Sequence, residues 1–145
     1  MTVDSLAVLQ KFYDAEAAYV RGDAGVEGMV VYLAADVVMS QAGVLPYGGE
    51  WRGAEGFAEF LTAFGEAWSA LEFLEQWFVV EGDVVVVHSR GRLTARATGR
   101  GLETELVQWI TFRDGLIAGF RPFYRDTAAV LDVLGVGYEG AGRSR

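Results

Sequence analysis

The chain has 145 residues, no cysteine, and 20 acidic against 12 basic side chains, which gives a formal net charge of −8. This length suits one domain with its own hydrophobic core. The absence of cysteine excludes disulfides, thiolate metal sites and a Cys nucleophile. The negative charge disfavours nucleic acid as a partner, because it repels phosphate backbones.

No segment has the features of a membrane anchor or an export signal. No apolar run approaches the roughly 20 residues of a membrane-spanning helix. The first residues, MTVDSLAVLQKF, lack the basic and apolar regions of a secretory signal. We therefore expect a cytoplasmic protein with no membrane partner. We expect a single domain over residues 1–145, with its core at about 4–135 and a flexible tail at 136–145.

The first third of the chain predicts two helices, a strand and a loop. Apolar residues recur at helical spacing from Asp4 to Arg21. That stripe comprises Leu6, Leu9, Tyr13, Ala17 and Val20, flanked by Phe12 and Glu16. A second, shorter helix is expected at Ala24–Leu33 and a short strand at Asp36–Gln41. Residues Ala42–Arg52 read as a loop because of their Gly and Pro residues. The loop's large side chains either form a lid over an apolar site or pack against the core.

The remainder predicts a helix, a sheet and a final helix. The spacing indicates a helix at Ala54–Trp68 and a strand at Leu71–Val80. Three antiparallel strands are then expected, at about Val84–Thr98, Leu102–Phe112 and Leu116–Arg125. Asp114-Gly115 supplies the two-residue hairpin turn between the last two. A short helix follows at Thr127–Leu134, with Asp126 as its N-cap and Gly135 at its end.

Helices followed by paired strands indicate an α+β fold, with N-terminal helices packed over the concave face of a curved antiparallel sheet. Strands of this length must twist and bend. The resulting cone encloses an apolar interior, which the many aromatic residues are expected to line. Several side chains combine an apolar body with a polar tip, which suits a pocket with few orienting groups. The candidate ligand-binding residues are Tyr13, Gln41, Tyr47, Trp51, Trp68, Gln108, Trp109 and Tyr124.

These features resemble the SnoaL-like branch of the nuclear transport factor two-like (NTF2-like) superfamily, over about residues 4 to 135. The matching motifs are Ala35-Asp36-Val37, Gly53 opening a helix with Phe57 and Phe60, Thr98-Gly99-Arg100, Phe112–Ile117, and Phe123–Asp126 before a short helix. The superfamily includes polyketide cyclases, ketosteroid isomerase, epoxide hydrolases and small-molecule binders. The resemblance therefore implies a fold and leaves the activity open.

The resemblance implies different site residues for each activity. At the places of the isomerase tyrosine, base and second donor stand Phe12, Ser40-Gln41 and Gln108, so that constellation is missing. No Arg-x-Asp pair of the epoxide-hydrolase type occurs in strands 84–125. The cyclases use an aspartate and a histidine in an apolar cavity, for which Asp126 and His88 are the candidates.

Each candidate also has a structural interpretation. Asp126 can cap a helix instead of acting as a base. Strand alternation points His88 away from the helices. One histidine is a poor basis for a metal site, and an aldol closure at a doubly activated carbon needs no cofactor, so we expect neither metal nor cofactor.

Three hypotheses remain open. The first is a cyclase, isomerase or lyase acting on an apolar, oxygenated polyketide-like or steroid-like compound. The second is a non-catalytic binder of an apolar small molecule in the same pocket. The third, compatible with both, is a homodimer formed through the outer face of the sheet. The arginines at positions 90 to 100 on that face indicate either a solvated or dimer-facing surface or an anion-binding patch.

Overall fold

The computed structural model describes residues 4–136 as a six-stranded sheet with four helices. The helices are α1 Ser5–Arg21, α2 Glu27–Val30, α3 Gly53–Ala67 and α4 Thr127–Leu134. The strands are β1 Leu33–Gln41, β2 Gly49–Arg52, β3 Trp68–Glu81, β4 Val84–Ala95, β5 Gly101–Arg113 and β6 Leu116–Tyr124. Their order across the sheet is β2-β1-β6-β5-β4-β3. The α+β prediction is confirmed. Of the tail predicted at 136–145, residues 137–145 lie outside the described part of the chain.

Local signals set the ends of α1 and α4 as predicted. Asp4 caps α1 by accepting hydrogen bonds from the backbone N–H groups of Leu6 and Ala7. Gly22, at φ 85°, ends that helix in the left-handed conformation. Asp126 caps α4 through Ala129 N, at 3.0 Å, and Gly135 ends it. These caps explain why both helices keep nearly the predicted bounds.

Strands β3 to β6 form the long antiparallel meander expected from the sequence. Asp114 and Gly115 both have positive φ, at 54° and 77°, as the predicted hairpin turn requires. On β4 the residues Val85, Val87, Ser89 and others in the same phase are buried, whereas His88 and Arg92 face outward. The prediction that His88 points away from the helices is confirmed.

Three predicted bounds in the first third are wrong. The helix expected at 24–33 is reduced to the four residues Glu27–Val30. The following strand begins at Leu33, three residues earlier than predicted. The expected loop at 42–52 ends in strand β2, which pairs antiparallel with β1. In addition, β1 pairs with β6 in parallel, a contact between distant segments that local patterns do not encode.

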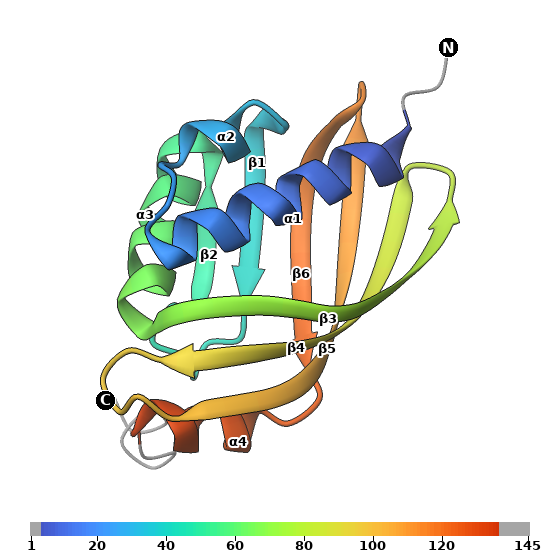
Figure 1. Cartoon of the computed structure of the whole chain (residues 1–145). Coiled ribbons are helices and arrows are strands. Elements are labelled where there is room, and N and C mark those ends of the chain that lie inside the picture. Colours follow the sequence, from blue (N-terminus) through green and yellow to red (C-terminus); the bar gives the residue numbers. More distant parts are fainter. Residues whose placement is uncertain (1–3, 137–145) are drawn as a thin grey trace.

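The sheet is strongly bent, and α1 lies across its concave side together with α2 and α3 (Figure 1). The core between these layers is rich in aromatic residues. Its largest fully buried side chains include Phe12, Tyr13, Tyr47, Phe57, Phe60 and Trp68. Within residues 4–136, no helix is both long and apolar enough to cross a membrane.

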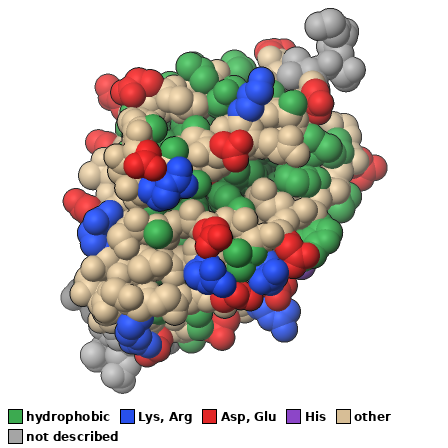
Figure 2. All heavy atoms as spheres, viewed as in Figure 1, with side chains coloured by type: hydrophobic (Ala, Val, Ile, Leu, Met, Phe, Trp, Pro, Cys, Tyr) green, Lys and Arg blue, Asp and Glu red, His purple; other side chains and the backbone are tan. Residues whose placement is uncertain are grey.

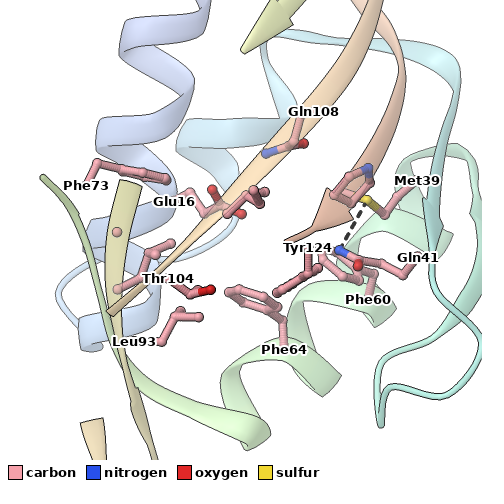
Figure 3. Close-up of a pocket in the computed structure, with 14 residues that line it drawn as sticks. Glu16, Met39, Gln41, Phe60, Phe64, Phe73, Leu93, Thr104, Gln108 and Tyr124 are labelled. Atoms are coloured by element: carbon pink, nitrogen blue, oxygen red, sulfur yellow. Dashed lines mark hydrogen bonds between the residues drawn. The ribbon is translucent and has the colours of Figure 1, made fainter. Parts of the chain in front are cut away.

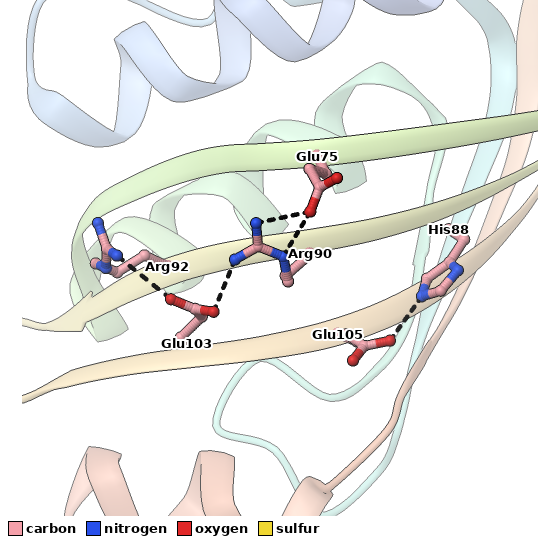
Figure 4. A network of polar contacts seen from close by, with 6 residues as sticks. All are labelled: Glu75, His88, Arg90, Arg92, Glu103 and Glu105. Carbon is pink, nitrogen blue, oxygen red and sulfur yellow. Dashed lines mark hydrogen bonds and ion pairs between the residues drawn. The ribbon is translucent and has the colours of Figure 1, made fainter.

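The outer face of the sheet carries a network of paired charges beside exposed apolar side chains. Arg90 hydrogen-bonds Glu75 at 2.7 Å and Glu103 at 2.7 Å, and Arg92 contacts Glu103 at 3.3 Å (Figure 4). Acidic and basic side chains alternate over the strands in the lower part of the molecule (Figure 2). Arg90 and Arg92 are thus paired with carboxylates of the same sheet.

Candidate active site

A cavity opens between α1, α3 and the concave face of the sheet. Its apolar walls include Met39, Phe60, Phe64, Leu71, Phe73 and Leu93. Its polar lining groups are Glu16, Gln41, Thr104, Gln108 and Tyr124. They come from α1, β1, β5 and β6, and Figure 3 shows them around one space. An apolar pocket with a few converging polar groups is the usual form of a small-molecule site.

The cavity is narrow in this conformation. Its atom-free space is about 550 Å³ including the mouth, but the centre of a water molecule can reach only about 40 Å³ of it. That volume holds a few water molecules and is too small for a ring compound. A ring must therefore displace water and move side chains, and Phe73 is suited to this, since it is half-buried beside a break in the β3–β4 register.

Glu16 is the only carboxylate among the cavity-lining residues, and its side chain enters from α1. It is 7% exposed and, among residues 4–136, has no hydrogen-bond donor. Burial raises the pKa of its carboxyl from 4.5 to about 7. A carboxyl with this pKa can exchange a proton near neutral pH, which is what a general base or acid requires.

Gln108 lies on β5 and lines the same cavity, where it is held by Tyr13. Its Nε2 donates to the Tyr13 hydroxyl at 3.3 Å, and its Oε1 has no partner although the residue is 9% exposed. An amide nitrogen carries two hydrogens, so one remains for a ligand. Burial also raises the pKa of Tyr13, with a further contribution from nearby Glu16. Tyr13 therefore remains protonated and acts on the cavity through Gln108.

Gln41 is a second buried amide with an unpaired end. The residue is 8% exposed, its Nε2 contacts the Met39 sulfur at 3.7 Å, and its Oε1 has no hydrogen-bond partner. Buried polar atoms are usually paired, so two orphaned amide oxygens in one cavity need an explanation. A ligand or ordered water in the cavity would supply the missing partners.

Three further aromatic residues form a chain behind the cavity wall. Trp68 Nε1 donates to the Tyr47 hydroxyl at 3.1 Å, and the Tyr47 and Tyr124 hydroxyls are 2.8 Å apart. Trp51 Nε1 donates to the Tyr47 carbonyl at 3.1 Å. Tyr47, Trp51 and Trp68 thus support the site from behind, whereas Tyr124 reaches the cavity.

Asp126 and His88, nominated as catalytic, lie away from the cavity. The Asp126 carboxylate is exposed and accepts a hydrogen bond from the backbone N–H of Ala129, as a helix cap does. His88 lies on the outer face, where Nε2 is 2.8 Å from Glu105 and the ring stacks on Trp77. Trp109 lies on the same outer face and is 47% exposed. Asp126, His88 and Trp109 are not among the residues that line the cavity containing Glu16.

The sequence did contain a signal for Glu16. The buried face of α1 comprises Leu9, Phe12, Tyr13, Glu16 and Val20, so the glutamate occupies a core position at helical spacing. The predicted stripe was displaced toward Leu6 and Ala17, which left Glu16 at its edge. The helical spacing that places Glu16 on the same face as Phe12 and Tyr13 was the sequence feature that indicated a buried carboxyl.

Comparison with known proteins identifies the family. A sequence profile of the SnoaL-like domain matches residues 9–120, whereas no curated protein sequence matches. An NTF2-like protein of unknown function from Burkholderia pseudomallei superimposes with a TM-score of 0.78 at 24% identity, covering 92% of this chain and 98% of that one.

Two other solved structures share the fold. TerC, co-crystallised with polyporic acid, has a TM-score of 0.77 at 22% identity, covering 90% of this chain and 98% of that one. A protein assigned as a SnoaL-like polyketide cyclase from Jannaschia has a TM-score of 0.76 at 17% identity, covering 92% and 93%. These similarities show a shared fold, and the profile match shows that the chain belongs to the SnoaL-like domain family.

Proposed function

We propose that the protein is a SnoaL-type isomerase or cyclase that uses Glu16 as its general base on an apolar, oxygenated compound. The observation that carries the proposal is the buried, unpaired Glu16 carboxyl, with its pKa raised to about 7 by an apolar cavity. Retaining such a group in the core costs stability. A catalytic role accounts for it.

The chemistry is proton transfer at a carbon next to a carbonyl group. The Glu16 carboxylate removes the proton, and the C–H electron pair moves into the carbonyl to form an enolate. The free hydrogen of Gln108 Nε2 donates to the enolate oxygen, and Tyr13 holds that amide in place. In a ring closure, the enolate carbon attacks a second carbonyl carbon, and protonated Glu16 returns its proton to the resulting alkoxide oxygen. In an isomerisation, the enolate is conjugated with a C=C bond, and Glu16 returns the proton to the far carbon of that conjugated system.

The substrate class follows from the cavity and from relatives. The walls are apolar and aromatic, and the few polar groups are spread around them, which suits a ring compound bearing several oxygens. Among proteins of this fold, one is assigned as a polyketide cyclase and another was crystallised with polyporic acid. These similarities support a polyketide-like or aromatic substrate.

The test is deuterium exchange at the activated carbon of a cyclic β-keto ester, ethyl 2-oxocyclopentanecarboxylate, followed by NMR in D₂O. We expect the protein to accelerate exchange, with a rate that rises through about pH 7 as Glu16 ionises. Glu16→Gln should reduce the acceleration by about a hundredfold or more. An unchanged rate in that variant would remove Glu16 from the mechanism.

Two variants control this experiment. Glu59→Gln removes an exposed glutamate on α3 and should leave exchange unchanged. Asp126→Asn keeps a residue that can cap α4 and should also leave it unchanged. Loss of exchange in Asp126→Asn would restore Asp126 as the base. Ligand binding without exchange in the wild type would favour the non-catalytic binder.

We also propose that the outer face of the sheet pairs two copies of the chain. Large apolar side chains are exposed there beside the charge network, namely Trp77, Val79, Val107, Trp109 and Phe123. A patch of this kind indicates an interface. A two-fold axis brings the same patch against itself, so a second copy supplies a matching surface.

Light scattering after size exclusion measures the mass in solution. We expect a dimer for the wild type and a monomer for Trp109→Glu, because that change places a charge in the apolar patch. Val31→Glu is the matched control and should stay dimeric, because Val31 is an exposed apolar residue that follows α2 and is not part of the outer sheet face. A monomeric wild type at tens of micromolar would contradict the dimer.

A further inference from the structure

The ends of β1 and β6 bring two polar side chains to the cavity wall away from Glu16. These strands run in parallel with Met39 beside Phe120, so Gln41 lies near Pro122, and Tyr124 is the next inward residue. Gln41, Pro122 and Tyr124 all line the cavity. Figure 3 shows Gln41 and Tyr124 together on one side, with Glu16 and Gln108 on the other.

The hydrogen-bond chain behind Tyr124 leaves its proton free for the cavity. The indole N–H of Trp68 can only donate, so the Tyr47 oxygen is the acceptor. Trp68 and Tyr47 are fully buried, so the Tyr47 proton also needs an acceptor, and the Tyr124 oxygen at 2.8 Å provides it. Tyr124 then accepts from Tyr47, and its own O–H is left to donate to a ligand.

The Gln41 amide has the complementary property. A thioether sulfur accepts hydrogen bonds and has no hydrogen to donate, so the amide nitrogen is the end that faces Met39. The oxygen is therefore the free end, and it is buried without a partner. Gln41 consequently offers an acceptor beside the donor of Tyr124.

We propose that Gln41 and Tyr124 form a hydroxyl anchor, which binds an alcohol, enol or phenol group of the substrate away from its reacting carbon. A hydroxyl accepts from Tyr124 and donates to Gln41, and so satisfies both. A ketone or ether oxygen can only accept, which leaves the buried Gln41 oxygen unpaired at a cost in affinity. The inference rests on the proposed function and narrows its substrate class to hydroxylated rings.

In this proposal, the two pairs of polar residues in the cavity have different roles. Glu16 and Gln108 face the carbon that loses a proton and its carbonyl, whereas Gln41 and Tyr124 hold the far end of the molecule. Binding at two separated points fixes the orientation of the reacting carbon toward Glu16. Loss of the anchor should therefore weaken hydroxyl recognition without changing the base.

Binding of phenol and of anisole, measured by NMR titration, tests the anchor without needing the natural substrate. Phenol both donates and accepts, whereas anisole only accepts. We expect the wild type to bind phenol about tenfold more tightly, as one additional buried hydrogen bond predicts. Equal affinities, tighter anisole binding, or no detectable binding of phenol at millimolar concentration would overturn the proposal.

Two conservative variants locate the effect. Gln41→Met should weaken phenol binding about tenfold and leave anisole binding nearly unchanged, because only phenol donates to Gln41. Tyr124→Phe should weaken both ligands, because both accept from Tyr124. A phenol preference that survives Gln41→Met but is lost in Gln108→Met would also overturn the proposal, since the hydroxyl would then bind on the opposite wall.

Failure of the anchor and failure of the proposed enzyme give different results. Glu16→Gln should lose deuterium exchange but keep the phenol preference. Gln41→Met should lose the preference for phenol, whereas Glu59→Gln, at an exposed position on α3, should keep both the preference and the exchange. A wild type that accelerates exchange but binds phenol and anisole equally would overturn the anchor alone. Circular dichroism melting confirms that each variant is folded, and the wild-type comparison of the two ligands requires no variant.

Discussion

The two faces of the sheet treat polar groups in opposite ways. On the outer face, Arg90 and Arg92 are paired with neighbouring glutamates, and these pairs are open to solvent (Figure 4). On the inner face, Glu16, Gln41 and Gln108 are buried, and the side-chain oxygens of Gln41 and Gln108 have no hydrogen-bond partner. The outer groups are satisfied by the fold itself, whereas the inner groups are not.

This difference separates polar groups that only support the fold from polar groups that a ligand would complete. Exposed ion pairs contribute little free energy and require no ligand. Buried polar atoms without partners destabilise the fold, so their presence indicates something that the folded chain alone does not contain. The comparison therefore favours the inner cavity as the candidate site, even though the outer face holds more charged side chains and the single histidine.

The largest expected effect comes from the buried carboxyl. The folded-state pKa of Glu16 is about 7, above its ordinary 4.5. Below pH 4.5 the Glu16 carboxyl is protonated in both the folded and the unfolded state, so its ionisation does not lower the free energy of unfolding. Between pH 4.5 and 7 the unfolded chain ionises first, so stability falls by about 3 kcal/mol as pH rises. Glu16→Gln should lack this decrease and exceed the wild type by a similar amount above pH 7.

Urea unfolding of both proteins from pH 4 to pH 8 measures this difference. Other carboxylates titrate over the same range, but they are common to both proteins and cancel in the subtraction. A difference that stays constant with pH would show that Glu16 is solvated. The inner face would then be no different from the outer face in this respect.

The next effect comes from the hydrogen-bond chain behind the cavity. Tyr47→Phe removes the acceptor of Trp68 and the partner of Tyr124, and leaves a buried indole N–H unpaired. We expect a loss of about 2 kcal/mol in the free energy of unfolding. Tyr19→Phe removes a hydroxyl that makes no hydrogen bond among residues 4–136, so it serves as the matched control. Equal losses of unfolding free energy in both variants would contradict a stabilising role for the Trp68–Tyr47–Tyr124 hydrogen bonds.

Local patterns predicted the elements of the fold and failed on its long-range contacts. The Asp126 cap and the Asp114-Gly115 turn depend on neighbouring residues, so sequence reasoning located them correctly. The pairing of β2 with β1 and of β1 with β6 depends on distant segments. The Gly and Pro residues of the 42–52 segment therefore predicted a loop over its whole length, although its last four residues form β2.

The site was predicted only in part for a related reason. Gln41, Gln108 and Tyr124 were predicted as ligand-binding residues from their polar tips on apolar bodies, and all three line the cavity. Glu16 was missed because a shift of one position in the helical stripe separates a core residue from an edge residue. Strand periodicity left both faces of β5 open, and burial places Gln108 inside and Trp109 outside.

The smallest expected effect concerns the outer face. Arg90→Gln keeps a hydrogen-bonding side chain but removes the charge that pairs with Glu75 and Glu103. The loss of stability should be smaller than that of Tyr47→Phe and should shrink in 1 M salt, because solvent-exposed charges are strongly screened there. Chemical denaturation with urea at low and high salt measures both quantities. A salt-independent loss as large as that of Tyr47→Phe would mean that the outer pairs support the fold as the inner chain does. A loss that increases with protein concentration would instead indicate that Arg90 contributes to the contact between two copies.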